Sequence, residues 1–277
     1  MASSAAQPKP IVDAKWARAH RGDKSVVFID TRAADDYWTG HLRGARHFDP
    51  FPFHYSDSSD RGVREFLAQL EWIFSALGIT GKETVVCYEN DSGMRAARVL
   101  WLLEWMGHRR VKMLDGGLRA LANEKLSTAP TAIKPTHFKG TAREEVSASS
   151  ADVVARLGRP EVRIFDVRSD AEYFGERVRA RHGGAIPGSA HRDWTEANTA
   201  DGKFKAPAAL RAEYEALGLR PGDEIIPYCQ GGYRAAHALV ALRLAGYTNV
   251  RNYWGSWADW GNRDDLPIEH PVRKGNG

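Results

Sequence analysis

The sequence predicts an α/β protein made of two tandem modules, each a parallel sheet flanked by helices. Three observations predict this fold class. Short segments rich in β-branched residues end at polar residues. In each half of the chain, the second of these segments is followed by a stretch with helical periodicity. This order of segments occurs twice along the chain. The length of 277 residues also suits two domains, because domains usually hold ~100–200 residues.

Two strands are predicted in each module, namely VVFID (26–30) and VVCY (85–88), then VRIFD (162–166) and IIPY (225–228). These segments are almost uniformly apolar, as expected of parallel strands that are buried on both faces. Helix-period stretches follow the second strands over residues 95–107 and 234–246 and end at Gly107 and Gly246. Ligand sites in such folds lie where the parallel strands end, so the loops after the strands are the places to look for chemistry.

A stretch without periodicity separates the two copies. Residues 126–145 are rich in proline and threonine, a composition that is typical of a linker. The sequence therefore predicts a first module over residues 1–125 and a second module over residues 146–277.

Composition and charge narrow the class of function. With 43% hydrophobic and 27% charged residues the chain is an ordinary globular protein. The net charge of +4 is spread out, and its densest cluster at 177–181 is too small for a nucleic-acid-binding arm. No segment approaches the ~20 apolar residues of a membrane helix, and the N-terminus is too polar for a signal peptide. We expect a cytoplasmic protein with no nucleic-acid or membrane partner; its charge is compatible with a small anionic substrate.

The chain has two cysteines, which excludes a disulfide framework and a four-thiolate metal site, and we expect no metal and no cofactor. Cys229 lies at a strand end and begins the loop CQGGYR. Gly231 and Gly232 allow the backbone N–H groups to point inward, while the following helix N-terminus and Arg234 add positive charge. Such a cradle lowers the pKa of a thiol, so we predict that Cys229 is a nucleophile. Cys87, inside an apolar strand, is predicted to be a core residue.

These features make the chain resemble the two-domain rhodaneses, which are thiosulfate sulfurtransferases. The resemblance covers residues 10 to 270 approximately and is carried by the tandem modules, the DVR and IPGS segments, the loop CQGGYR with its Cys-x-x-Gly-x-Arg pattern, and the closing YWGSWADWG. It implies that the first module is catalytically silent, because Glu89 occupies the position of the cysteine. It also implies that Cys229 takes the outer sulfur of thiosulfate as a persulfide and passes it to a thiophilic acceptor such as cyanide. The expected partners are a small anionic sulfur donor and that acceptor.

The loop supplies most of the candidate substrate-binding residues. We expect contacts from Gln230, Gly231, Gly232 and Tyr233, and from the guanidinium of Arg234, whose fork matches two oxygens of a sulfonate-like group. We expect Arg234 to bind the substrate and to leave the pKa of the thiol unchanged.

Two further candidates, Arg168 and Trp257, have structural alternatives. Arg168 belongs to an Asp-x-Arg pair that recurs as Asp30 and Arg32 in the silent module, which favours a structural ion pair over substrate contact. Trp257 lies in a segment that the family places beside the active loop, although most tryptophans are core residues. Ser256 and Asp259 form a capping-box signature at a helix start.

No histidine of the second module is expected to act as a base, since the loop dipoles suffice, and His237 is predicted to pack or to face solvent. Three other functions stay open. A phosphatase-like enzyme on the same fold would have five residues between cysteine and arginine, whereas this loop has four. A 3-mercaptopyruvate sulfurtransferase typically has the loop CGSGVT. A non-enzymatic sulfur carrier would use the same cysteine.

Overall fold

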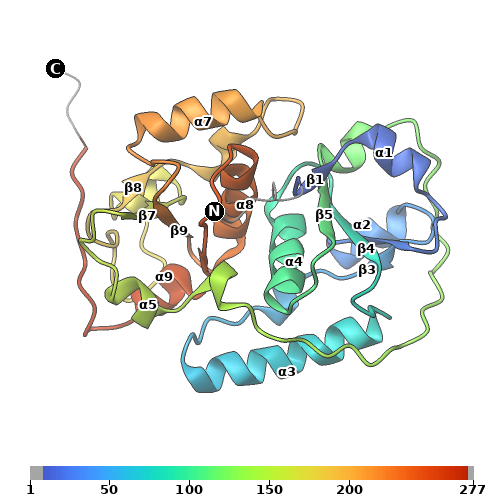
Figure 1. Ribbon diagram of the computed structural model, residues 1–277, viewed down its shortest axis with the longest axis horizontal. Coiled ribbons are helices and arrows are strands. Elements are labelled where there is room, and N and C mark those ends of the chain that lie inside the picture. The colour runs from blue at the N-terminus through green and yellow to red at the C-terminus, as the bar shows by residue number, and fades with distance from the viewer. Residues whose placement is uncertain (1–8, 274–277) are drawn as a thin grey trace, which may run out of the picture.

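The computed structural model describes residues 9–273, which form two α/β domains that lie side by side (Figure 1). The first domain runs from blue to green in the figure, and the second from yellow to red. The predicted α/β class and the tandem arrangement of parallel sheets flanked by helices are confirmed.

The first domain is built on a five-stranded parallel sheet with the strand order β1-β5-β4-β2-β3. Its strands are β1 (Ile11–Val12), β2 (Val26–Asp30), β3 (Arg46–His47), β4 (Thr84–Tyr88) and β5 (Val111–Leu114). Its α-helices are α1 (Ala14–Ala19), α2 (Ala34–Thr39), α3 (Asp60–Ala76) and α4 (Met94–Trp105).

The second domain has a three-stranded parallel sheet with the order β8-β7-β9, and a short parallel pair formed by β6 and β10. Its strands are β6 (Ser147–Ala148), β7 (Val162–Asp166), β8 (Ala190–His191), β9 (Glu224–Tyr228) and β10 (Asn252–Tyr253). Its α-helices are α5 (Ser150–Val154), α6 (Asp170–Tyr173), α7 (Pro207–Ala216), α8 (Tyr233–Leu244) and α9 (Ser256–Trp260).

The two domains repeat one another in register. Asp30 at the end of β2 pairs with Tyr88 of β4, and Asp166 at the end of β7 pairs with Tyr228 of β9. The helices α4 and α8 follow β4 and β9 at equivalent positions, and each is followed by a glycine with φ near +90°, namely +88° at Gly107 and +89° at Gly246. The strands and helices that the repeat predicts are therefore present in both halves.

The stretch predicted as a linker lies along the first domain. Ser127 forms a single antiparallel bridge with His41, and the backbone N–H of Thr136 donates to the carbonyl of Ser75 on α3 at 2.9 Å. The side chain of Phe138 is buried against the core. This stretch therefore covers the first domain on its way to β6.

The two domains share one hydrophobic core. Helices α4 and α8 pack against each other across the boundary, and one buried cluster contains residues of both domains. Trp254, just after β10, lies with its ring 5.5 Å from the ring of Trp105 on α4 and 5.5 Å from that of Phe66 on α3. The second domain is thus built against aromatic side chains of the first domain.

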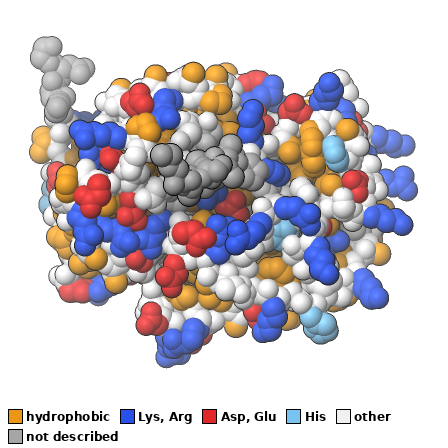
Figure 2. Space-filling model, viewed as in Figure 1, with side chains coloured by type: hydrophobic (Ala, Val, Ile, Leu, Met, Phe, Trp, Pro, Cys, Tyr) orange, Lys and Arg blue, Asp and Glu red, His pale blue; other side chains and the backbone are white. Residues whose placement is uncertain are grey.

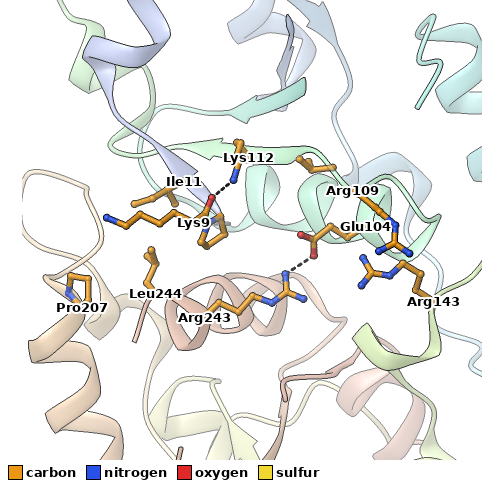
Figure 3. Close-up of a pocket in the computed structure, with 11 residues that line it drawn as sticks. Lys9, Ile11, Glu104, Arg109, Lys112, Arg143, Pro207, Arg243 and Leu244 are labelled. Atoms are coloured by element: carbon orange, nitrogen blue, oxygen red, sulfur yellow. Dashed lines mark hydrogen bonds and ion pairs between the residues drawn. The ribbon is translucent and has the colours of Figure 1, made fainter. Parts of the chain in front are cut away.

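Basic side chains gather where α4 and α8 end. Arg243 of α8 forms an ion pair with Glu104 of α4 at 2.5 Å, and Lys112 of β5 donates to the backbone carbonyl of Lys9 (Figure 3). These residues line an interdomain cavity of about 630 Å³. On the face shown in Figure 2, Lys and Arg side chains are interspersed with Asp and Glu. Within residues 9–273 there is no helix with the length and apolar character needed to cross a membrane.

Candidate active site

The loop after β9 forms the predicted cradle around the sulfur of Cys229. The backbone N–H of Gly232 donates to Cys229 Sγ at 3.2 Å. Gly232 has a φ of +80°, and a Cβ at this position would lie 2.6 Å from Nη1 of Arg98 and from the carbonyl oxygen of Trp254. Only glycine fits both this backbone conformation and this space. The second glycine of the loop is therefore what lets the amide reach the sulfur.

The surroundings of the two cysteines give their thiols opposite properties. Burial by itself would raise the pKa of the Cys229 thiol, but the Arg234 guanidinium and the N–H groups of Ala235, Gly231 and Gly232 outweigh it and lower this pKa. Burial raises the pKa of the Cys87 thiol, in the interior of β4. Cys229 is thus set up as a thiolate and Cys87 as a core residue.

Arg234, at the start of α8, has its fork bound by Glu172 of α6. Nη1 donates to Oε2 at 2.6 Å and Nη2 donates to Oε1 at 2.9 Å. This ion pair contributes to a pKa of about 2 for Glu172, although burial of the carboxyl opposes the shift. The expectation that Arg234 leaves the thiol pKa unchanged is wrong, because Arg234 is the largest of the influences that lower it. Its fork, predicted to face substrate oxygens, is held by a carboxylate instead.

The predicted capping box at Ser256 is also wrong. Ser256 has a φ of +55°, and its hydroxyl donates to the carbonyl of Tyr253 at 2.7 Å and accepts the N–H of Cys229 at 3.0 Å. The carboxylate of Asp259 accepts from the hydroxyls of Ser58 and Tyr253. The Ser256 hydroxyl therefore bonds to the backbone of the loop and of Tyr253 and does not cap the helix.

The first two N–H groups that follow Ser256 hold the loop as well. The N–H of Trp257 donates to the carbonyl of Cys229 at 3.0 Å, and that of Ala258 donates to the carbonyl of Gln230 at 2.8 Å. Together with the Ser256 hydroxyl, α9 therefore fixes the backbone of the loop on the side away from the thiolate cradle.

A cavity of about 250 Å³ lies over the loop, between the two domains. Five of its lining residues come from the loop and the start of α8, and four come from elsewhere. The loop residues are Cys229, Gln230, Gly231, Tyr233 and Arg234, and the others are Phe51, His54, Met94 and Arg179. Gly232 takes part through its N–H to the sulfur and is not itself a lining residue.

The four additional lining residues were missed in the sequence. Arg179 belongs to the basic cluster at 177–181, so its local charge was a usable signal; its side chain is 45% exposed and is 3.3 Å from Glu172. Phe51, His54 and Met94 belong to the first domain. No local pattern marks them, because they reach the site only through the packing of segments that are far apart in the sequence, as when Tyr233 donates to the carbonyl of Pro50, 183 positions away, at 2.9 Å.

Arg168 and Trp257 lie behind the loop, and neither is among the residues of 9–273 that line the cavity. The Arg168 guanidinium donates to both oxygens of Asp166 and to the carbonyl of Gly184, and it stacks 4.5 Å from the Trp257 ring. Arg32 donates in the same way to Asp30 and Gly40 in the first domain. This repetition matches the structural alternative for the Asp-x-Arg pair.

In the first domain a carboxyl group occupies the equivalent of the sulfur position. Glu89 follows β4, and its Oε1 accepts the N–H groups of Arg95 at 2.8 Å and Ala96 at 3.0 Å at the start of α4. Burial raises the pKa of this carboxyl to about 7, against the effect of those two amides. The amides at the start of α4 are therefore present in the first domain as well, and the carboxyl group of Glu89 occupies them.

His237 is a packing residue at the domain boundary. Its ring lies against Phe204 and Trp194, its Nε2 is 3.0 Å from the carbonyl oxygen of Ser92, and burial lowers its pKa to about 3. It is fully buried and does not line the cavity.

Comparison with known proteins assigns the chain to a family. The model of the rhodanese-like domain matches it twice, over residues 13–124 and 149–263. The thiosulfate sulfurtransferase of Azotobacter vinelandii is 34% identical over 88% of this chain and 91% of its own length. The thiosulfate sulfurtransferase of Corynebacterium glutamicum is 34% identical over 95% and 91%. The sulfur carrier protein TtuD of Thermus thermophilus is 32% identical over 95% and 97%.

Solved structures show the same fold at lower identity. The anaerobic ergothioneine biosynthesis enzyme of Chlorobium limicola superposes with a TM-score of 0.86 at 21% identity, over 96% of this chain and 71% of that one. With two matches of the family model and relatives above 30% identity along most of its length, this chain belongs to the rhodanese family and carries two rhodanese-like domains.

Proposed function

We propose that this protein is a thiosulfate sulfurtransferase that transfers sulfur through a persulfide on Cys229. The observation that carries the proposal is the cradle, in which the Gly232 N–H donates to Sγ at 3.2 Å and Arg234 lowers the pKa of the thiol. A thiolate that is held by backbone donors beside a cavity is a nucleophile aimed at a small substrate. The names of the relatives in Azotobacter and Corynebacterium support thiosulfate as the donor.

Each half of the proposed reaction balances without a cofactor. The Cys229 thiolate attacks the outer sulfur of thiosulfate, a new S–S bond forms, and the sulfur–sulfur bond of thiosulfate breaks as sulfite leaves with the electron pair. A thiophilic acceptor such as cyanide then attacks the outer sulfur of the persulfide, and the Cys229 thiolate leaves. Because thiolate and persulfide are both anions, the same N–H donors stabilise both states of the enzyme.

The sulfite end of the donor needs a cation that is open to the cavity. Arg234 has its fork on Glu172, whereas Arg179 also lines the cavity and is 45% exposed. We assign Arg179 to the oxygens of the donor and Arg234 to the reacting sulfur. Gln230 and Tyr233 also line the cavity and would contact the donor. Trp257 donates its N–H to the carbonyl of Cys229, and Arg168 stacks on the Trp257 ring.

A sulfur carrier function is the second candidate. The relative in Thermus thermophilus bears that name at 32% identity, and the same persulfide would serve it with a protein as acceptor. The two functions differ in turnover, since a carrier does not convert thiosulfate and cyanide steadily. A cytoplasmic location stays a prediction.

The test of the proposal is a comparison of two matched variants. Cys229→Ser should abolish the transfer of sulfur from thiosulfate to cyanide, whereas Cys87→Ser should keep most of it. Mass spectrometry of the protein after incubation with thiosulfate should find one added sulfur atom on the peptide that contains Cys229. Turnover on 3-mercaptopyruvate, measured alongside, should be lower than on thiosulfate. Full activity of Cys229→Ser would overturn the proposal.

A further inference from the structure

We propose that the interdomain cavity at the end of α8 binds a small organic polyphosphate of the nucleoside triphosphate class, and that this ligand bridges the two domains (Figure 3). The site is separate from the one proposed for sulfur transfer, since within residues 9–273 the two cavities share no lining residue. They lie at opposite ends of α8, whose 12 residues span about 18 Å.

The cavity has the size and the position of a ligand site. Its volume of about 630 Å³ lies within the ~300–1,000 Å³ that is typical of small-molecule pockets, which often form between domains. Its walls come from β1, α4 and β5 of the first domain, from the stretch 126–145, and from α7 and α8 of the second domain. A molecule bound here would therefore contact both domains at once.

Positive charge is concentrated in this cavity. Its lining contains five cationic side chains and one carboxylate, namely Lys9, Arg109, Lys112, Arg143, Arg243 and Glu104. The excess equals the net charge of +4 that the whole chain carries. The formal charges of all the other residues therefore balance, and the cavity is where the protein favours an anion.

Nearby carboxylates neutralise only part of this charge. Glu104 pairs with Arg243 at 2.5 Å, and Glu145, which lies outside the lining, pairs with Arg143 at 2.7 Å. Within residues 9–273, three lining cations form no ion pair with a carboxylate: Lys9, Arg109 and Lys112. A ligand with three or more negative charges would supply the anions that these side chains lack.

Lys112 and Arg109 offer a phosphate two different kinds of contact. Lys112 of β5 is half-buried and donates to the backbone carbonyl of Lys9, and burial lowers its pKa although Glu104 opposes the shift. An anion beside this ammonium would offset the cost of burying it. Arg109 is exposed, and the planar fork of its guanidinium matches two oxygens of a phosphate group.

The helix ends explain only one of the five cations. The last carbonyl groups of a helix carry partial negative charge, which favours a cation in the last turn. Arg243 lies in the last turn of α8 and fits this role. The other four cations lie outside the helices, on β5 or on segments between elements. Their convergence on one cavity is therefore left for a ligand to explain.

Apolar side chains form the other part of the cavity. Ile11, Leu244 and Pro207 lie on one side of the view in Figure 3, and Arg109 and Arg143 lie on the opposite side. This arrangement suits a ligand that has a charged end and an apolar or aromatic body. A nucleoside triphosphate has both parts, whereas an inorganic anion would leave the apolar part unfilled.

The experiment is calorimetric titration of the full-length protein with ATP, AMP or inorganic triphosphate, at low ionic strength and without divalent cations. Arg109→Gln and Lys112→Gln each remove a cation from the cavity, and Glu104→Gln removes its carboxylate. Arg110→Gln is the matched control, because Arg110 is exposed beside Arg109 and does not line the cavity. Arg179→Gln tests for binding over Cys229 instead.

We expect Arg109→Gln and Lys112→Gln each to weaken the binding of ATP by about tenfold or more, as for other charge-assisted hydrogen bonds. Glu104→Gln should strengthen it, because a repelling charge is lost and Arg243 is released. Arg110→Gln should change the affinity by less than about twofold, since an exposed charge away from the ligand is screened. AMP and inorganic triphosphate should both bind more weakly than ATP.

Four results would overturn the proposal. The first is that ATP does not bind to the unmodified protein. The second is equal weakening in Arg110→Gln and Arg109→Gln, which would reveal a diffuse effect of net charge. The third is a loss of affinity in Arg179→Gln alone, which would place the ligand over Cys229. The fourth is that inorganic triphosphate binds as tightly as ATP, which would exclude an organic ligand that uses the apolar part.

Discussion

Arg98 of the first domain lies against Gly232 of the loop after β9, and its Nη1 donates to the Gly232 carbonyl oxygen at 3.4 Å. The side chain is 1% exposed, and within residues 9–273 it has no ion pair with a carboxylate and its Nη2 has no hydrogen-bond partner. Instead it stacks on the rings of Trp101 at 4.7 Å and Tyr233 at 4.9 Å. Burial lowers the pKa of Arg98 to about 10, while Tyr233 and the sulfur of Cys229 oppose that shift. A buried cation without a carboxylate opposes folding, and the Cys229 sulfur, when it is ionised, offsets part of that cost.

Arg98→Met should therefore change the free energy of unfolding and the reactivity of the Cys229 thiol in different ways. Methionine fills a similar volume without the buried charge, so the free energy of unfolding should stay the same or increase. The pKa of Cys229 should rise, because a nearby cation is lost. Unfolding by denaturant measures the change in stability. The rate of alkylation of the thiol by iodoacetamide, followed against pH, measures the change in pKa. Arg64→Met, at an exposed position, is the control. A large loss of stability with an unchanged thiol pKa would make Arg98 a packing residue only.

The ion pair between Arg234 and Glu172 predicts that substitutions of its two members shift the pKa of the Cys229 thiol in opposite directions. Arg234→Ala should raise the pKa of the thiol and lower kcat/KM for thiosulfate by about one to two decades, since a charge-assisted contact at the sulfur is lost. Arg234→Lys should recover part of it. Glu172→Gln should lower the pKa of the thiol, because the positive charge of Arg234 is then no longer neutralised by a carboxylate. Alkylation profiles and thiosulfate kinetics of the three variants check this, and a shift in the same direction in all of them would contradict it.

The same pair should make the protein sensitive to acid. The pKa of Glu172 is about 2 in the folded protein against an ordinary 4.5, so the pair stabilises the fold fully above pH 4.5 and its contribution is lost as the pH falls toward 2.

Gly232→Ala should be more damaging than an alanine at another left-handed glycine. At Gly188, where φ is +69° and nothing lies within 4 Å of a Cβ, alanine should cost only the backbone strain of roughly 1–2 kcal/mol. At Gly232 the same strain is joined by contacts of 2.6 Å with Arg98 and Trp254. We expect a larger loss of unfolding free energy and nearly complete loss of sulfur transfer. Equal losses in the two variants would show that the close contacts relax.

Glu89 predicts a pH-dependent stability that an uncharged side chain would remove. Its pKa is raised to about 7 in the fold, from an ordinary 4.5 in the unfolded chain, so ionisation weakens the fold as the pH rises through 7. Glu89→Gln keeps an oxygen for the two amides of α4 and does not ionise. Its unfolding free energy should match that of the unmodified protein near pH 4.5 and exceed it above pH 8. A constant difference across this range would contradict the prediction.

The sequence predicted the parts of this protein that are local or repeated. Strands β2 and β7, the helices after β4 and β9, and the cradle around Cys229 follow from apolar runs, helical periodicity and two adjacent glycines. What it did not predict depends on contacts between distant segments. Phe51 and His54 line the cavity from the first domain. Ser256 does not form the predicted cap, because its hydroxyl accepts the N–H of Cys229.

The hydrogen bonds from α9 also mean that the loop is completed only after Cys229 itself has been synthesised. A polypeptide is synthesised from its N-terminus, so Cys229 leaves the ribosome before the segment 256–258 that fixes its backbone. Until that segment arrives, the loop lacks the three hydrogen bonds by which residues 256–258 fix the backbone of Cys229 and Gln230. A chain that stops short of residue 256 should therefore hold Cys229 less rigidly than the chain that contains this segment.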